Sequence, residues 1–132
     1  SYLNELSTAL AKYQHESGLW YQVTDQGDRE GNYLEASGTA MFTYAIAKGV
    51  NRGYLDPTFM SIAEKGFEGL TKRLIKRDEN GFITLTQVCA VAGLGGNPFR
   101  DGSYEYYINE RKKDNDPKGT GPFILAALEL NR

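Results

Sequence analysis

Residues 31–50 read GNYLEASGTAMFTYAIAKGV and decide the fold class, because they combine a helical pattern with a start and a stop signal. Ser37 is a suitable N-cap, and Gly49 is a suitable C-terminal stop. Many of the positions between them are small, which favours close packing against another helix. The stretch predicts a helix whose core side carries Met41, Phe42, Ala45 and Ile46.

Three other segments predict helices. Residues 3–14 have apolar side chains at helical spacing. Asp56 and Pro57 form a cap followed by a first-turn proline, and they open a helix that continues to about Ile75. Thr120 can cap a last helix, whose expected buried residues are Ile124, Leu125, Leu128 and Leu130.

The remaining segments predict short extended pieces and loops. GLWYQV at 18–23 is a short extended piece, DENG at 78–81 is a turn, and FITLTQV at 82–88 is a short strand or hairpin arm. Residues 89–116 are rich in glycine and predict an irregular segment. An irregular segment of this length inside a compact domain is usually functional.

Composition narrows the classes of partner. The 132 residues suffice for one domain, with 40% hydrophobic residues, 24% charged residues and a formal net charge of -2. The basic cluster between Lys72 and Arg77 is placed at a helix end, so no nucleic acid partner is expected. No apolar run is long enough for a membrane span, and no membrane partner is expected.

The metal-binding and nucleophilic residues are few. Cys89 is the single cysteine and lies in an apolar setting, which favours a buried, inert thiol. His15 is the single histidine and is placed at a helix end. We therefore expect no metal site and no cofactor, and a Ser-His-Asp or Cys-His arrangement could be built only through His15.

Four stretches together resemble the C-terminal part of the unsaturated rhamnogalacturonyl hydrolases, glycoside hydrolase family 105, which is related to family 88. They are GLWYQV at 18–23, residues 31–50, DGSYEYYINE at 101–110 and NDPKGTGPFILAALE at 115–129. The stretches keep the family's order and spacing and cover nearly the whole chain. The combination of LEASGTAMF…AKGV with KGTGPFILA is the most specific part of the resemblance.

The resemblance implies an all-α fold, the (α/α)6 toroid of six antiparallel helical hairpins, with a sugar cleft where the inter-helix loops converge. The helices predicted from this sequence make two or three hairpins. We therefore expect residues 1–132 to form a single domain that corresponds to the C-terminal part of the toroid, a partial toroid with a small β-hairpin or extended loops. The family also implies a bacterial protein of pectin degradation, placed in the cytoplasm or the periplasm.

Members of the family hydrate the C4=C5 double bond of an unsaturated uronyl sugar at the non-reducing end of an oligosaccharide. An aspartate serves as both general acid and general base, and in the family it lies in the N-terminal half. No matching stretch is found in this sequence, so the isolated chain is expected to be inactive. The alternative is a non-catalytic helical module that binds sugar or forms oligomers.

Four candidate substrate-binding residues lie near the first two stretches. Trp20 can stack on a sugar face, and Gln22 would point to the same side of an extended segment; the alternative is a core tryptophan beside a solvated glutamine. Tyr33 and Glu35 precede the helix of residues 37–49, and Glu35 also suits a charge at a helix N-terminus. In this region NYLEASG departs from the tryptophan and arginine found in relatives.

Four more candidates lie in the C-terminal third. Arg100 and Asp101 can pair with each other or with a substrate carboxylate. Tyr104 pairs with Tyr107 if its segment is helical, and the resemblance makes Tyr104 a cleft residue and Tyr107 an anchor. Lys118 can bind an anionic sugar.

The expected partners follow from the resemblance. An oligosaccharide with an unsaturated uronic acid is the expected ligand. Because an incomplete toroid leaves apolar helix flanks uncovered, we also expect either self-association or an N-terminal half that covers these flanks.

Overall fold

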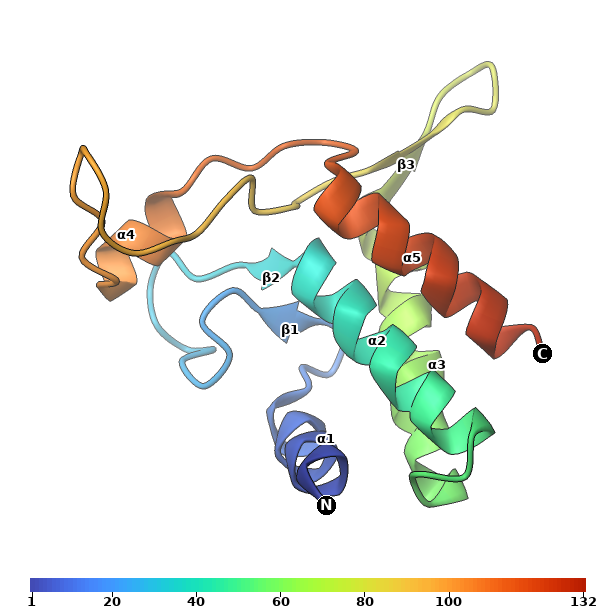
Figure 1. Ribbon diagram of the computed structural model, residues 1–132. Coiled ribbons are helices and arrows are strands. Elements are labelled where there is room, and N and C mark those ends of the chain that lie inside the picture. Colours follow the sequence, from blue (N-terminus) through green and yellow to red (C-terminus); the bar gives the residue numbers. More distant parts are fainter.

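The computed structural model describes residues 1–132 and is mostly helical, with two small sheets (Figure 1). A 3-10 turn at Pro57–Phe59 leads into α3, and a π-helical turn at Leu70–Leu74 follows it. Each sheet is an antiparallel pair of strands. The elements are α1 (Tyr2–Tyr13), β1 (Trp20–Tyr21), β2 (Leu34–Glu35), α2 (Ala36–Asn51), α3 (Met60–Gly69), β3 (Ile75–Arg77), β4 (Ile83–Leu85), α4 (Tyr104–Asn109) and α5 (Pro117–Leu130).

Helix α2 lies at the centre of a layer that it forms with α3 and α5 (Figure 1). Its core side is built from small residues, so neighbouring helices can approach closely. A Cβ added at Gly49 would lie 2.8 Å from Leu55 Cδ1. Phe67 of α3 and Phe123 of α5 stack with ring centroids 5.2 Å apart. The buried residues of α2 are Ala36, Thr39, Ala40, Thr43, Ile46, Ala47 and Gly49.

The prediction of a helix in residues 31–50 is confirmed, but its ends and its buried side differ. The N-cap is Glu35, two residues earlier than the expected Ser37, because its carboxylate accepts hydrogen bonds from two backbone N–H groups of the first turn. Gly49 lies inside the helix, where a side chain would clash with Leu55. Met41 is 44% exposed, and the helix turns its small residues to the core instead.

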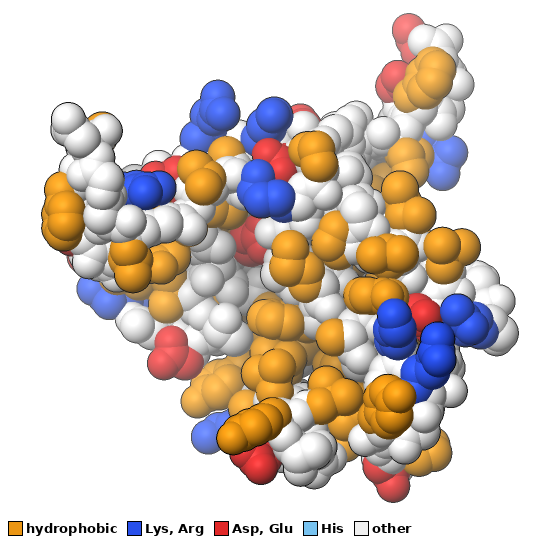
Figure 2. All heavy atoms as spheres, viewed as in Figure 1, with side chains coloured by type: hydrophobic (Ala, Val, Ile, Leu, Met, Phe, Trp, Pro, Cys, Tyr) orange, Lys and Arg blue, Asp and Glu red, His pale blue; other side chains and the backbone are white.

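The last helix also differs from the prediction. It begins after Asp116, whose carboxylate caps it, and Thr120 lies in its first turn. Three of the four aliphatic residues that were expected to be buried face outward: Ile124 is 58% exposed, Leu125 43% and Leu128 62%. Only Leu130 is partly buried, against the core cluster that contains Ile46. Small Gly119 packs against Val88, and Ala126 and Glu129 are buried. Figure 2 shows hydrophobic side chains gathered on the face over α2 and α5.

Residues 86–116 form an arm that leaves the helical layer, carries α4 at its far end and returns to α5 (Figure 1). The segment is irregular as predicted except for α4, which settles the conformation of residues 104–109 as helical. The predicted hairpin arm is present as β4, which pairs with β3. None of the helices combines the length and the hydropathy of a membrane span.

Candidate functional site

A hollow of about 310 Å³ lies where β1, the N-terminus of α2, the arm and the N-terminus of α5 meet. We call it the Lys118 hollow. It brings together three of the eight predicted site residues, Gln22, Glu35 and Lys118. The full lining is Gln22, Glu35, Ser37, Gly38, Met41, Cys89, Val91, Ala92, Tyr107 and Lys118.

Glu35 is a buried carboxylate, only 4% exposed, that joins α2 to the arm. Its Oε1 accepts hydrogen bonds from the Ser37 N–H at 3.0 Å, the Ser37 hydroxyl at 2.7 Å and the Cys89 N–H at 2.9 Å. Its Oε2 accepts from the Gly38 N–H at 2.6 Å. Both oxygens are thus occupied by the protein, as suits an N-cap carboxylate at a helix N-terminus.

Gln22 lines the hollow and is held in place by two contacts. Its Nε2 donates to Cys89 Sγ at 3.3 Å and to the Tyr107 carbonyl at 3.4 Å, so its amide oxygen remains for a ligand. Cys89 is buried as predicted, and burial raises the pKa of its thiol. The site therefore contains a neutral thiol and not a nucleophilic thiolate.

Tyr33 does not line the Lys118 hollow, but it neighbours Cys89, which does. Its hydroxyl is buried and makes no hydrogen bond, although the Cys89 thiol lies close enough to affect its ionisation. Burial, followed by the neighbouring Cys89 and Glu35, raises the pKa of the Tyr33 hydroxyl. Lys112 Nζ lies 4.1 Å from the centre of the Tyr33 ring. Tyr33 is thus a neutral residue outside the hollow, and its ring packs against Lys112 of the arm.

Lys118 contributes the positive charge of the hollow. Its Nζ donates to Asp116 Oδ1 at 2.6 Å, and its side chain remains 50% exposed. Asp116 is 4% exposed and also accepts from the Lys118 N–H at 3.0 Å. The hydrogen bonds from Lys118, with the charge of Lys113 nearby, lower the pKa of the Asp116 carboxyl. Asp116 therefore fixes where the ammonium group lies.

We expect the Asp116 charge to stabilise the fold in a pH-dependent way. Because its folded pKa is below the unfolded value of about 3.9, its contribution is present above about pH 4 and is lost as the pH falls through the folded pKa. Asp116→Asn should remove this decrease in stability at acid pH, because the asparagine side chain does not titrate. The helix start is kept, since asparagine is an equally good N-cap. Urea unfolding between pH 2 and 6 measures the effect. Asp114→Asn, at an exposed carboxyl, is the control and should still lose stability as the pH falls.

Trp20 is part of the core and not of a sugar-binding surface. It is 1% exposed, and its Nε1 donates to the Leu10 carbonyl at 2.8 Å. Its ring lies edge-on to Phe42 at 5.4 Å. Of the two alternatives that the sequence left open, the structure therefore has the core tryptophan, because no face of the indole is free for a ligand.

Arg100 and Asp101 do not pair with each other. The Arg100 guanidinium turns back onto its own loop, where Nε donates to the Gly95 carbonyl at 2.9 Å and Nη2 to the Leu94 carbonyl at 3.3 Å. Asp101 Oδ1 accepts from the Ser103 N–H at 2.9 Å, and this bonding lowers the pKa of the Asp101 carboxyl. Both residues lie outside the Lys118 hollow.

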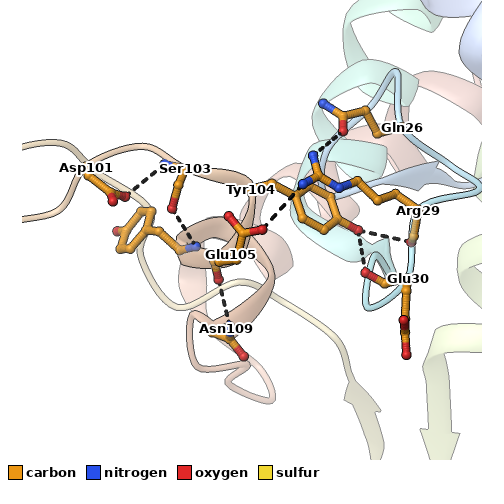
Figure 3. Close-up of polar contacts among 9 residues, drawn as sticks. Gln26, Arg29, Glu30, Asp101, Ser103, Tyr104, Glu105 and Asn109 are labelled. Carbon is orange, nitrogen blue, oxygen red and sulfur yellow. Dashed lines mark hydrogen bonds and ion pairs between the residues drawn. The ribbon is translucent and has the colours of Figure 1, made fainter.

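Tyr104 fastens α4 to the loop that precedes β2 (Figure 3). Its one O–H is shared between the carbonyls of Arg29 and Glu30, at 3.0 and 2.9 Å. The Arg29 guanidinium lies over its ring at 3.8 Å and pairs with Glu105 at 3.4 Å. Tyr104 is thus the anchor, whereas Tyr107, the expected anchor, lines the hollow.

Two residues that shape the site, Asp116 beside the hollow and Tyr107 in its lining, were not predicted as site residues. Asp116 precedes a proline at the start of a helix, as Asp56 does, so the same cap signal could have identified it. Tyr107 had no comparable signal. Its place in the hollow depends on where the arm returns to α5.

Comparisons with known proteins identify the family of the chain. The whole chain, residues 1–132, matches Glycosyl Hydrolase Family 88. Protein Atu3128 of Agrobacterium fabrum is 38% identical over 130 residues, covering 94% of this chain and 56% of the relative. An unsaturated 3S-rhamnoglycuronyl hydrolase of Alteromonas sp. is 29% identical over 122 residues, covering 92% of this chain and 25% of the relative.

Solved structures give the same result. A glycoside hydrolase of family 105 from C. acetobutylicum has a TM-score of 0.91 and 48% identity, covering 95% of this chain and 35% of that chain. A possible family 105 member from Salmonella enterica has a TM-score of 0.75 and 31% identity, covering 93% and 29%. This chain thus spans about half the length of its curated relative from A. fabrum and about a third of these structures. The chain belongs to glycosyl hydrolase family 88.

Proposed function

We propose that this chain supplies part of the saccharide-binding surface of a hydrolase that acts on unsaturated uronyl oligosaccharides, such as those derived from rhamnogalacturonan in pectin. The observation that carries the proposal is the Lys118 hollow. It gathers a fixed cation, a free amide oxygen and apolar walls from four separate segments. The name of the Alteromonas relative, an unsaturated 3S-rhamnoglycuronyl hydrolase, supports the substrate class.

The hollow suits the carboxylate of a uronyl sugar. Lys118 directs one N–H to Asp116, which leaves two donors for a ligand. The Gln22 amide oxygen can accept a hydrogen bond from a sugar hydroxyl. Met41, 44% exposed, and Val91, 54% exposed, offer apolar surface to the carbon skeleton of the ring.

The proposed reaction adds water across the C4=C5 double bond of the unsaturated sugar. A carboxylic acid gives its proton to C4 and, as a carboxylate, takes a proton from the water that attacks C5. The resulting hemiketal opens, and the glycosidic bond breaks. Glu35 is poorly suited to this role, since its two oxygens already accept four hydrogen bonds from the protein. The general acid/base is therefore proposed to lie outside residues 1–132.

The outward face of α5 supports a proposal about which part of the longer enzyme packs against this chain. Ile124, Leu125 and Leu128 are large and exposed, and together they form an apolar surface. In the partial (α/α)6 toroid that we propose, further helical hairpins of the longer enzyme cover this face. The second candidate function, a non-catalytic sugar-binding or oligomerising module, follows if a second copy of the chain covers it instead.

One experiment addresses both the activity and the hollow. The chain is incubated with an unsaturated rhamnogalacturonan disaccharide while the absorbance of the double bond is followed, and no turnover is expected. Binding of the same disaccharide is measured by NMR titration. Lys118→Met should weaken binding by about tenfold, because it removes a charge-assisted hydrogen bond.

Lys113→Met is the matched control, because Lys113 also lies beside Asp116, at 3.9 Å, but does not line the hollow. It should leave the affinity unchanged. Sustained turnover would contradict an external general acid/base. Equal affinities for the two variants would contradict the assignment of the Lys118 hollow.

A further inference from the structure

A second hollow, of about 420 Å³, lies between the loop of residues 93–100 and α4. We call it the Phe99 hollow. It shares no residue with the Lys118 hollow. Its lining combines two aromatic rings, two opposite charges and an amide: Asn97, Pro98, Phe99, Arg100, Tyr106 and Glu110.

The loop that forms one wall is held in place by its own hydrogen bonds. Gly95 and Arg100 exchange backbone hydrogen bonds of 2.8 and 3.0 Å, as in a small hairpin. The Arg100 side chain adds its bonds to Gly95 and Leu94. The Gly93 N–H donates to the Tyr106 hydroxyl at 3.0 Å, which ties the loop to α4. A wall fixed in this way loses little conformational entropy when a ligand binds.

The two charged groups of the hollow are available to a ligand. Arg100 and Glu110 form no ion pair with each other or with any other residue. Arg100 Nη1 has no hydrogen-bond acceptor, although the other two nitrogens are occupied. A Cβ added at Gly93 would lie 2.7 Å from Nη1, so glycine is what lets the guanidinium lie against the backbone. The hollow therefore offers a fixed donor, the Arg100 guanidinium, and an acceptor, the Glu110 carboxylate. The two charges cancel.

The aromatic rings give the hollow an apolar surface. Phe99 is 78% exposed, so its ring is accessible to a ligand. Tyr106 is held edge-on against Tyr107, with ring centroids 5.3 Å apart. A flat apolar face beside fixed polar groups is the arrangement that pyranose rings favour, because they present C–H groups on one face and hydroxyls at the edge.

We propose that the Phe99 hollow binds a neutral pyranose, with the ring on Phe99 and neighbouring hydroxyls between Arg100 and Glu110. A diol both donates and accepts hydrogen bonds, so it matches the pair of opposite charges. A uronate would gain attraction from Arg100 but meet repulsion from Glu110. The inference rests on the proposed function for the origin of the sugar, which would be a neutral residue of the same class of oligosaccharide.

The test is an NMR titration of the ¹⁵N-labelled protein with methyl α-L-rhamnopyranoside, a neutral pyranoside. Amide shifts are expected at Gly93, Gly96, Arg100 and Tyr106. Phe99→Ala should weaken binding by about tenfold, through loss of the apolar contact. Glu110→Gln should weaken it several-fold while keeping the shape of the side chain. Phe82→Ala is the control, since Phe82 is similarly exposed, at 72%, on the distant β3–β4 turn.

Equal affinity of Phe99→Ala and Phe82→Ala, or no shift around the hollow, would overturn the proposal. A change of sedimentation coefficient in Phe99→Ala without a change in sugar binding would overturn it as well, because the loop would then be a protein contact. Lys118→Met separates the two proposals. If Lys118→Met changes neither the affinity for the rhamnoside nor the affinity for the uronyl disaccharide, only the assignment of the Lys118 hollow is refuted.

Discussion

Alanine at position 20 is expected to lower the free energy of unfolding by about 3–5 kcal/mol. Trp20 is 1% exposed, and its Nε1 holds the Leu10 carbonyl of α1, so its loss leaves a large cavity and an unpaired buried acceptor. The ring also lies at the junction of α1, β1 and α2, since Phe42 of α2 packs edge-on against it. The substitution should therefore loosen three elements at once.

Urea unfolding followed by circular dichroism measures this effect, because Trp20 is the single tryptophan and its removal eliminates the fluorescence signal. Trp20→Phe keeps most of the side-chain volume but not the N–H group. It should lower the free energy of unfolding less than Trp20→Ala does. Phe82→Ala, on an exposed turn, should change stability by no more than about 0.5 kcal/mol. An unchanged midpoint for Trp20→Ala would mean that the indole is not buried.

The second large effect is expected for Glu35→Ala, at about 2–4 kcal/mol. The substitution removes the cap of α2 and leaves the N–H groups of Ser37, Gly38 and Cys89 without their acceptor. The Cys89 N–H lies in the arm, so the same change also weakens the attachment of the arm to the helical layer, which the bond from the Ala36 N–H to the Gln87 carbonyl still supports. Thermal unfolding of the variant should therefore begin with the arm.

Two variants test this explanation. Glu35→Gln retains one acceptor oxygen and should lose roughly half as much stability. Glu30→Ala removes an exposed carboxylate of the preceding loop and should have little effect. If Glu35→Ala and Glu30→Ala were equally stable, the four hydrogen bonds of Glu35 would contribute nothing, and its role as a cap would have to be abandoned.

Local patterns predicted where helices lie better than which side they bury. The segments of α1, α2 and α5 were found from apolar spacing and cap residues. The buried side of α5 was wrong because periodicity assumes that large aliphatic residues face the core. In this fold the core side of α5 is set by close approach to α2, which favours Ala126 over Leu125 and Leu128.

The candidate site was predictable one residue at a time and not as an arrangement. Gln22, Glu35 and Lys118 were each chosen for chemistry, and they meet in one hollow. The contacts that assemble it join residues far apart in sequence: Glu35 and Cys89 are 54 positions apart, and Gln22 and Cys89 are 67 apart. No local pattern specifies such pairs. Whether Trp20 faces sugar or core depended on the same long-range packing.

The attachment of α4 has a consequence for hydrogen exchange. This helix has no buried residue, and its attachments are polar contacts at its surface. They are made by the Tyr104 hydroxyl, the Arg29–Glu105 ion pair, the bond from the Gly93 N–H to the Tyr106 hydroxyl and the bond from Gln22 to the Tyr107 carbonyl. Amides of such a segment exchange through local opening, whereas those at the centre of α2 exchange only when the whole domain unfolds. Both hollows are lined partly by α4. A sugar bound in either of them would therefore slow exchange in α4 selectively, and so report its own binding without any change in the core.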